Sequence, residues 1–234
     1  MIVITYGLRY WLLQIRFFDP DEFEHLHSAW LISQGYLPYL DYFEHHTPAL
    51  HFLLAQFFGF FEVESDSAQA VEMLIFARRV MWLLTGVILL LVFTLGKVWE
   101  NWRVGIMGTV FQVCTLMFQE KTLEIRPDLL SVPMLLGSLV LLIRAITVDS
   151  LKEATKKWLM AACGFLLGAG IMATQKMLFV MPGFTLAMFI YWFHPQSPGT
   201  FQSRFILVVY QLTGFFTPIL LMLGYFALHD GAYT

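Results

Sequence analysis

The chain has 234 residues, of which 58 % are hydrophobic and 13 % are charged, and its formal net charge is −3. A soluble domain usually carries about 25 % charged residues, so this composition excludes a water-soluble fold and requires lipid to solvate the apolar surface. The negative charge argues against a nucleic-acid partner. Because the apolar runs are continuous and lack the alternation of barrel strands, the sequence predicts an all-α, polytopic integral membrane protein. We expect one transmembrane domain over 1–234.

Seven apolar stretches approach the ~20 residues that a bilayer crossing needs. They lie at about 2–17, 78–99, 103–119, 129–147, 158–174, 177–193 and 204–228. The segment 50–61 is only about 12 residues long, which fits an interfacial or re-entrant helix, with a slightly short span as the alternative. Arg9 and Arg16 interrupt the first stretch, and the chain stops soon after the last one. We therefore expect the N-terminal part of a longer protein.

The charges at the span ends give an orientation. With Arg9 and Arg16 left uncounted, seven Lys and Arg residues fall on one side of the expected spans and five on the other. The positive-inside rule makes the richer side cytoplasmic, so the first long loop, 19–66, lies on the outer side. Five of the seven histidines lie between Asp19 and His51. So many ionisable groups at the membrane surface are more than a structural connection needs.

The outer loop begins with an expected helix over about 21–34. Pro20 ends the first span, and Asp21 and Glu22 stand in the first turn of the new helix, where carboxylates complement the helix dipole. Gly35 ends this helix. Its apolar flank is expected to hold Phe23, Leu26, Trp30 and Ile32, with Glu22, His25 and Ser33 lying away from that flank. Two interpretations of the acidic residues at the start of this helix stay open. They cap its N-terminus, or they supply a carboxylate that faces an outer cavity and acts as a general base or metal ligand.

Three further groups of residues carry potential chemistry. Glu44, His45 and His46 precede Pro48 and are rich in potential ligands, but their spacing matches no zinc signature, so an anionic-ligand or sugar pocket and a solvated loop stay open. Asp128 is expected to cap the helix that it opens, and Arg126 to pair with a carboxylate or hold a phosphate.

A lone lysine, Lys176, follows the glycines Gly168 and Gly170. It either snorkels or binds a phosphate oxygen. The two cysteines, Cys114 and Cys163, lie in apolar runs. We interpret them as packing residues and not as a disulfide or metal pair.

One long segment resembles a known family. Residues 19–58, DPDEFEHLHSAWLISQGYLPYLDYFEHHTPALHFLLAQFF, contain the pattern G-x-x-P-Y-x-D-x-F-E-H-H-x-P. This pattern resembles the GT-C glycosyltransferases, and within them the branch of protein O-mannosyltransferases and bacterial aminoarabinose–lipid A transferases. The motifs RPD at 126–128 and GAGIMATQK at 168–176 are similar to later parts of the same family.

The resemblance implies a reaction and its partners. Such enzymes take a sugar from a polyprenyl-phosphate donor and transfer it, with inversion, to a lipid, glycan or protein acceptor on the outer face of the membrane. It implies a bacterial inner membrane with the site facing outward. Asp21 aligns with the family's acidic residue, which accepts a proton from the acceptor hydroxyl or orients it.

The resemblance also suggests which residues bind substrate. The candidates are Glu22, Glu44, His45, His46, Arg78, Arg126, Asp128 and Lys176. Arg78 or its neighbour Arg79, Arg126 and Lys176 are the expected phosphate-binding cations. His45 or His46 stands where relatives often carry a basic residue, and Asp128 matches the family's second acidic position. Family members with and without a metal exist, so a divalent metal ion as cofactor is left open.

Two other classes of protein remain as alternatives. A transporter or flippase for a lipid-linked or anionic substrate needs charged groups within its spans, near the midplane. Here the charges gather at the span ends instead. An accessory membrane subunit would leave the acidic outer loop without a task.

Overall fold

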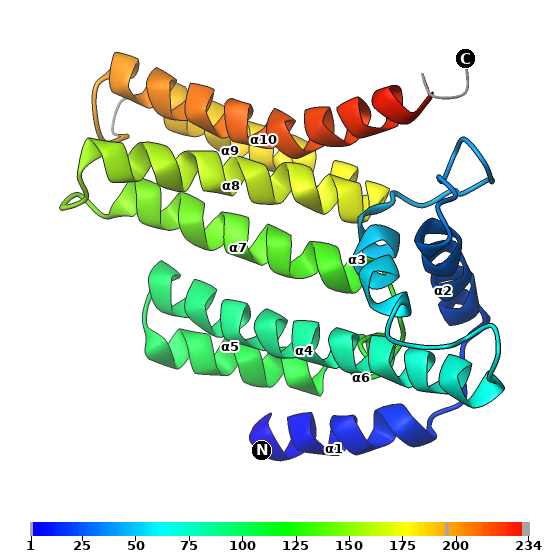
Figure 1. The fold of residues 1–234 in the computed structure, drawn as a ribbon. Coiled ribbons are helices and arrows are strands. Elements are labelled where there is room, and N and C mark those ends of the chain that lie inside the picture. The colour runs from blue at the N-terminus through cyan, green and yellow to red at the C-terminus, as the bar shows by residue number, and fades with distance from the viewer. Residues whose placement is uncertain (1, 195–196, 231–234) are drawn as a thin grey trace. The chain divides into compact units, whose positions relative to one another are not determined.

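The computed structural model describes residues 2–194 and 197–230. Over these residues the chain forms ten α-helices and one 3₁₀ helix, η1, and its only β-type pairing is an isolated bridge between Pro38 and Tyr42 (Figure 1). The all-α prediction is therefore confirmed. The chain divides into two compact units, Met1–Pro133 and Met134–Thr234, which are described separately. The expected single domain over 1–234 stays a prediction.

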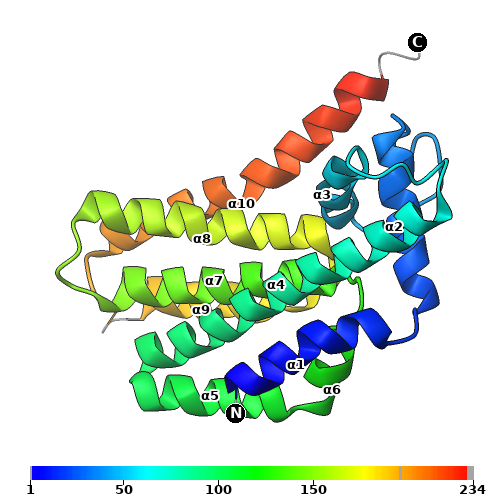
Figure 2. The same cartoon turned by 60° about the horizontal axis from the view of Figure 1, so that its bottom comes forward.

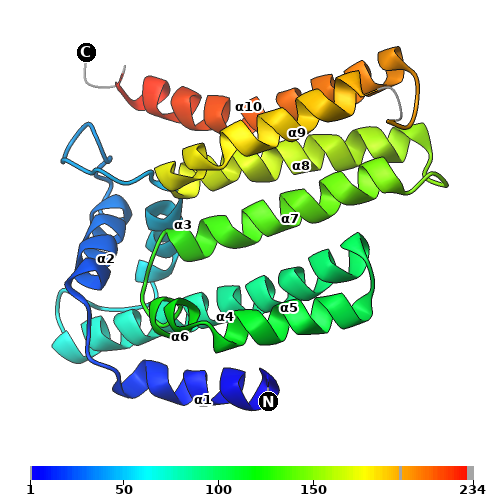
Figure 3. The ribbon, with the colours of Figure 1, turned by 180° about the vertical axis from the view of Figure 1, so that it is seen from behind.

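The helices of the first unit are α1 (Ile2–Ile15), α2 (Pro20–Ser33), α3 (Ala49–Phe58), α4 (Ser67–Trp99), α5 (Trp102–Cys114) and α6 (Leu116–Lys121). The helix α1 packs on α4 through Tyr6 and Trp82, whose rings stack with centroids 4.4 Å apart. The helices α4 and α5 run side by side from a tight corner, where their glycines Gly96 and Gly105 let the two backbones touch (Figure 3). The helices α2 and α3 pack against each other in the segment 19–66 of this unit.

The expected break before α2 is confirmed, but the buried face of this helix differs from the expectation. Asp19 caps α2 in a capping box with Glu22, and Gly35 follows the helix with a positive φ of 92°. The buried face carries the polar side chains Glu22, His25 and Ser28 together with the apolar Leu26 and Ala29, whereas Phe23 is exposed. The polar face is inside because charged and histidine partners from α4, α3 and the loop before α3 meet it there, as described below.

Two predicted spans have different bounds in the structure. The helix α4 begins at Ser67, capped by Asp66, and not near residue 78. Its 33 residues are about 50 Å long, against about 30 Å for a hydrocarbon core. The prediction of one continuous span over 103–119 is wrong, because the extended backbone of Thr115 separates α5 from the short α6. Buried Arg9 of α1 donates to the carbonyl oxygens of Phe118 and Gln119, which lie in the last turn of α6.

The second unit holds most of α7 (Asp128–Thr147), then α8 (Glu153–Ala173), η1 (Gln175–Phe179), α9 (Met181–Phe193) and α10 (Phe201–Asp230). Glycines bring α8 and α10 into backbone contact: a Cβ on Gly164 would lie 1.9 Å from the Gln211 carbonyl oxygen. Such small-residue contacts are common between membrane helices. The C-terminal part of α10, which contains Pro218, diverges from α8 (Figure 2). Cys163 is buried and Cys114 exposed, both as free thiols, so the expected packing role fits Cys163 and not Cys114.

Among the described residues, four helices are long and apolar enough to cross a membrane: Ser67–Trp99, Asp128–Thr147, Glu153–Ala173 and Phe201–His229. Two shorter apolar helices, Ala49–Phe58 and Met181–Phe193, do not reach that length. These four helices are compatible with an integral membrane protein. They are fewer than the seven expected spans, and α3 has the short length expected of an interfacial helix.

Candidate functional site

Two clusters of ionisable side chains lie in the first unit. One surrounds Arg126 in the segment between α6 and α7, and we call it the Arg126 cluster: Arg16, Asp21, Lys121, Glu124, Arg126 and Asp128. The other lies between α2 and the loop before α3, and we call it the His45 cluster: Glu24, Glu44, His45 and His46. Together they contain six of the nine residues that the sequence suggested for the site.

Arg126 is the centre of the first cluster. Its Nη1 lies 3.0 Å from Glu124 Oε2 and 3.8 Å from Asp21 Oδ2, and its Nε lies 3.9 Å from Asp128 Oδ2. Asp21 is held only loosely, and its side chain is 57 % exposed. Asp128 is the first residue of α7. The structure thus brings together three of the predicted residues, Asp21, Arg126 and Asp128.

Glu124, which the sequence reasoning missed, anchors this cluster. Its carboxylate is buried and lies 2.6 Å from Arg16 Nη2 and 3.1 Å from Lys121 Nζ, in addition to Arg126. Burial opposes its ionisation, but the hydrogen bonds from Lys121, Arg126 and Arg16 outweigh burial and lower the pKa of Glu124 below its usual value. Three cations and three carboxylates balance in charge, so an incoming phosphate would compete with Asp21 and Asp128 for Arg126.

Glu22 and Arg78 form a buried ion pair. Arg78 Nε and Nη2 lie 2.8 and 2.5 Å from the two Glu22 carboxylate oxygens, and both side chains are completely enclosed. Arg78 also donates to the backbone carbonyls of Leu13, Arg16 and Phe17, and Glu22 accepts from the Ile125 N–H. This arrangement differs from the predicted substrate contact. It indicates that the pair fixes the α1–α2 corner, α4 and the 122–128 segment to one another.

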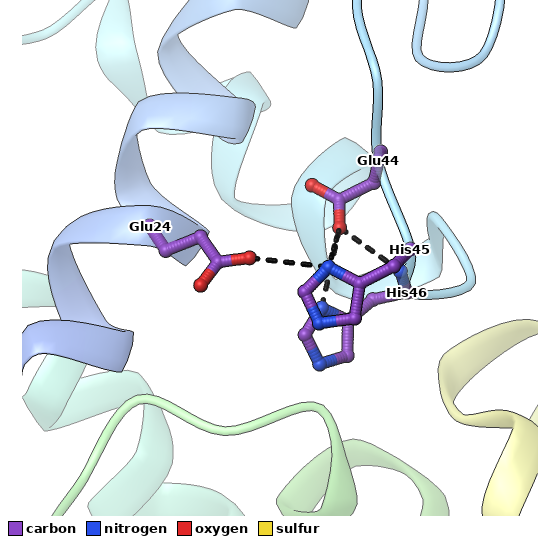
Figure 4. A group of neighbouring side chains, drawn as sticks. All are labelled: Glu24, Glu44, His45 and His46. Atoms are coloured by element: carbon purple, nitrogen blue, oxygen red, sulfur yellow. Dashed lines mark hydrogen bonds and ion pairs between the residues drawn. The ribbon is translucent and has the colours of Figure 1, made fainter.

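The His45 cluster joins α2 to the loop before α3 (Figure 4). His45 Nδ1 lies 3.3 Å from Glu24 Oε1 and 3.7 Å from Glu44 Oε1, and His46 Nδ1 lies 3.2 Å from Glu44 Oε1. One donor atom from each of the four residues lies within 4.8 Å of the others. Two imidazoles and two carboxylates suit a divalent transition metal such as zinc. The sequence pointed to Glu44, His45 and His46 but missed Glu24.

A buried polar layer supports Glu44 from behind. Ser28 Oγ donates to one Glu44 oxygen, and the His46 N–H donates to the other at 2.9 Å. These hydrogen bonds overcome the opposing effect of burial and lower the pKa of Glu44. His51 Nε2 lies 3.2 Å from His25 Nδ1, while His51 Nδ1 lies 4.0 Å from Glu44 and has no hydrogen-bond partner in the described part of the chain.

The two buried histidines are neutral at pH 7. Burial is the main cause, and it lowers the pKa of His25 to about 3 and that of His51 to about 4. Neighbouring histidines add to the effect, and so does the charge of Arg126 on His25. The helical spacing of Glu22, His25 and Ser28 was the signal in the sequence for this buried polar face.

Lys176 belongs to the second unit. It lies in η1, is exposed, and its N–H donates to Thr174 Oγ1 at 3.4 Å. Its expected part in binding a phosphate together with the residues of the first unit stays a prediction.

Comparison with models of known protein families, with curated proteins and with solved structures finds no match for this chain. The function therefore has to be argued from the residues and their geometry.

Proposed function

We propose that this protein is a membrane glycosyltransferase of the GT-C type, which transfers a sugar from a polyprenyl-phosphate donor to an acceptor at the outer face of a membrane. The observation that carries the proposal is the pairing of Asp21 with Arg126. A largely exposed carboxylate lies 3.8 Å from a guanidinium that is 22 % exposed. A base beside a cation is what hydroxyl attack on a phosphate-linked sugar requires.

The reaction would proceed by direct displacement. The acceptor hydroxyl oxygen attacks the anomeric carbon, and its proton passes to the Asp21 carboxylate. The bond between the anomeric carbon and the phosphate oxygen breaks, and the polyprenyl phosphate leaves with the electron pair. Arg126 stabilises the charge that develops on the leaving phosphate. Attack opposite to the leaving group inverts the configuration of the sugar.

The position of these residues along the helices supports this chemistry. Asp21 follows α1 by a few residues, and Arg126 stands two residues before the start of α7, one of the four long apolar helices. Residues just outside spans lie at the depth of the lipid head groups, where the phosphate of a lipid-linked donor is found. We further propose that α1, the pair α5 and α6, and α9 complete about seven crossings, in a bacterial inner membrane with the site outward.

The His45 cluster fits a divalent cation. Glu24, Glu44, His45 and His46 would hold it, with Ser28 and His51 behind Glu44 as a supporting layer. Such an ion would supply positive charge beside the reaction site and fix the loop before α3 against α2. No step of the displacement described above depends on it.

A transporter or flippase is the alternative that the sequence left open. It would need charged groups that line a pathway within the spans. Arg9 is a charged residue within α1, but it is buried and its guanidinium is occupied by Phe118, Gln119 and Thr122 at α6. Its surroundings therefore support a structural role for Arg9 and leave the glycosyltransferase as the better-supported function.

Replacing the base tests the proposal. The full chain, reconstituted in liposomes with a panel of polyprenyl-phosphate sugars, should transfer sugar, and the Asp21→Asn variant should be slower by about 100-fold or more. The Glu100→Gln variant serves as a control because it removes an exposed carboxylate at the far end of α4, and it should keep full activity. Equal rates for Asp21→Asn and the unmodified chain would contradict the proposed base.

A further inference from the structure

The outward flank of α2 lines a groove that the reaction site does not use. Phe23, Leu26 and Trp30 of α2 line one wall, and Val71 and Leu74 of α4 line the other. The groove encloses about 430 Å³ and is mostly apolar. Three of the four residues that the sequence placed on one apolar flank of α2 thus share a surface, and Ile32 does not line it. Leu26 forms the buried floor of this groove, whereas Phe23 is exposed.

A second, more polar cleft adjoins this groove. It encloses about 390 Å³ and is lined by the C-terminal end of α2, the end of α3 and the following loop. Trp30, Phe58, Val63 and Glu64 line both spaces, so the two adjoin at these four side chains. A site with an apolar channel on one side and a polar cleft on the other matches an amphipathic ligand.

The charges of the cleft are acidic. Glu62 and Glu64 line it, both exposed, and among the described residues no lysine or arginine lines either space or pairs with these carboxylates. An anionic head group such as a phosphate would be repelled here. A protonated amine would be attracted by both carboxylates.

The Trp30 indole marks the junction of the two spaces. Its ring stacks on His27, and its Nε1 is buried without a hydrogen-bond partner among the described residues. A buried N–H donor normally finds an acceptor. A ligand with a hydroxyl or carbonyl oxygen between its head and its chain would supply that acceptor.

The groove lies at the N-terminal end of α4, the longest of the four apolar helices. It lies against the first turns of α4, and the 33 residues of α4 exceed what the hydrocarbon core needs, so these turns reach the head-group region. Phe23 is 53 % exposed and Phe60 is 79 % exposed. Aromatic side chains exposed at this depth are typical of contact with the lipid interface.

We propose that the groove and the cleft form a binding site for one amine-bearing lipid, such as a long-chain amino alcohol. Its hydrocarbon chain lies between α2 and α4, its amine faces Glu62 and Glu64, and its hydroxyl oxygen accepts from Trp30 Nε1. The site is distinct from the Arg126 and His45 clusters. The proposal does not depend on the glycosyltransferase function.

Photo-crosslinking of the full chain in nanodiscs tests this site. The probe is a long-chain amino alcohol with a diazirine in its chain, compared with the corresponding diol and with the amino alcohol phosphate. Peptide mass spectrometry should place the label within 18–30 and 63–74, and the amino alcohol should label several-fold more than the diol or the phosphate. Equal labelling by all three probes, stronger labelling by the phosphate, or no label in these segments would overturn the proposal.

Four variants sharpen the result. Ala70→Trp fills the groove from an exposed position and should abolish the label. The double variant Glu62→Gln with Glu64→Gln should reduce the preference for the amino alcohol over the diol by roughly three- to tenfold. Trp30→Phe should weaken labelling by the amino alcohol and by the diol alike. The control Glu72→Gln removes an exposed carboxylate from the same end of α4 and should change nothing. Labelling that survives Ala70→Trp, or an amine preference that survives the double variant, would refute the site.

Discussion

The buried pair of Glu22 and Arg78 makes a strong prediction about stability. In Arg78→Met the Glu22 carboxylate stays buried without its partner, and the carbonyls of Leu13, Arg16 and Phe17 lose their donor. Removing one member of a fully buried ion pair costs about 3–5 kcal/mol. For a chain of this size, 1 kcal/mol corresponds to about 2–4 °C in Tm, so Tm should fall by roughly 6–20 °C.

Thermal unfolding of the purified protein in detergent, followed by tryptophan fluorescence, measures this loss. The matched control is Arg79→Met, because Arg79 is the exposed neighbour on the same helix and its replacement should change the unfolding free energy by less than about 0.5 kcal/mol. A second variant, Glu22→Gln with Arg78→Met, should recover part of the loss because no charge is then left buried. If Arg78→Met and Arg79→Met unfold at the same temperature, the pair does not hold the corner between α1, α2 and α4.

Three further predictions concern the metal donors, the buried histidines and the helix contacts. The protein should bind one zinc ion per chain by elemental analysis, and His46→Ala should weaken that binding at least tenfold; equal zinc content in both would contradict the donor set. Because burial lowers the pKa of His25 and His51 below the unfolded value of about 6.5, the unfolded chain binds more protons, and stability should fall as pH drops from about 6.5 to 4. In metal-free protein each histidine lowers the free energy of unfolding by up to about 1.4 kcal/mol for each pH unit of acidification. His51→Gln should therefore flatten the dependence of Tm on pH. An unchanged dependence would refute the assignment of His51 as a histidine that is neutral in the folded protein. A Cβ on Gly214 would lie 1.9 Å from the Ala161 carbonyl oxygen, so Gly214→Ala should lower Tm well beyond Gly183→Ala, which meets nothing within 4 Å.

The sequence was sufficient for most helices because their signals are local. The apolar runs and the stops at Pro20 and Gly35 located α1, α2 and the helices of the second unit to within a few residues. The start of α4 was missed because Arg78 and Arg79 were expected at the end of a span, whereas the helix continues through both of them from Ser67, where Asp66 provides the N-terminal cap. The break at Thr115 could not be predicted from the sequence, because the apolar run over 103–119 has no proline or glycine at that point.

The site was predictable in its residue types but not in its pairings. Arg126 and Asp128 were chosen as one group and Asp21 as part of another, and the structure brings the three together around Arg126, which the buried Glu124 also binds. Glu24 and His45 meet only because the loop before α3 folds back onto α2. Contacts between residues distant in sequence depend on tertiary structure, which no local pattern encodes.

The central claim is that Asp21 and Arg126 act on a lipid-linked sugar. The most direct measurement follows sugar transfer and lipid translocation in the same vesicles, with a polyprenyl-phosphate sugar as donor. The proposal predicts that the unmodified chain releases polyprenyl phosphate in step with a product of inverted configuration, and that Asp21→Asn stops this release without loss of folded protein. Movement of the intact donor across the bilayer without release of polyprenyl phosphate would contradict the proposal and favour a flippase.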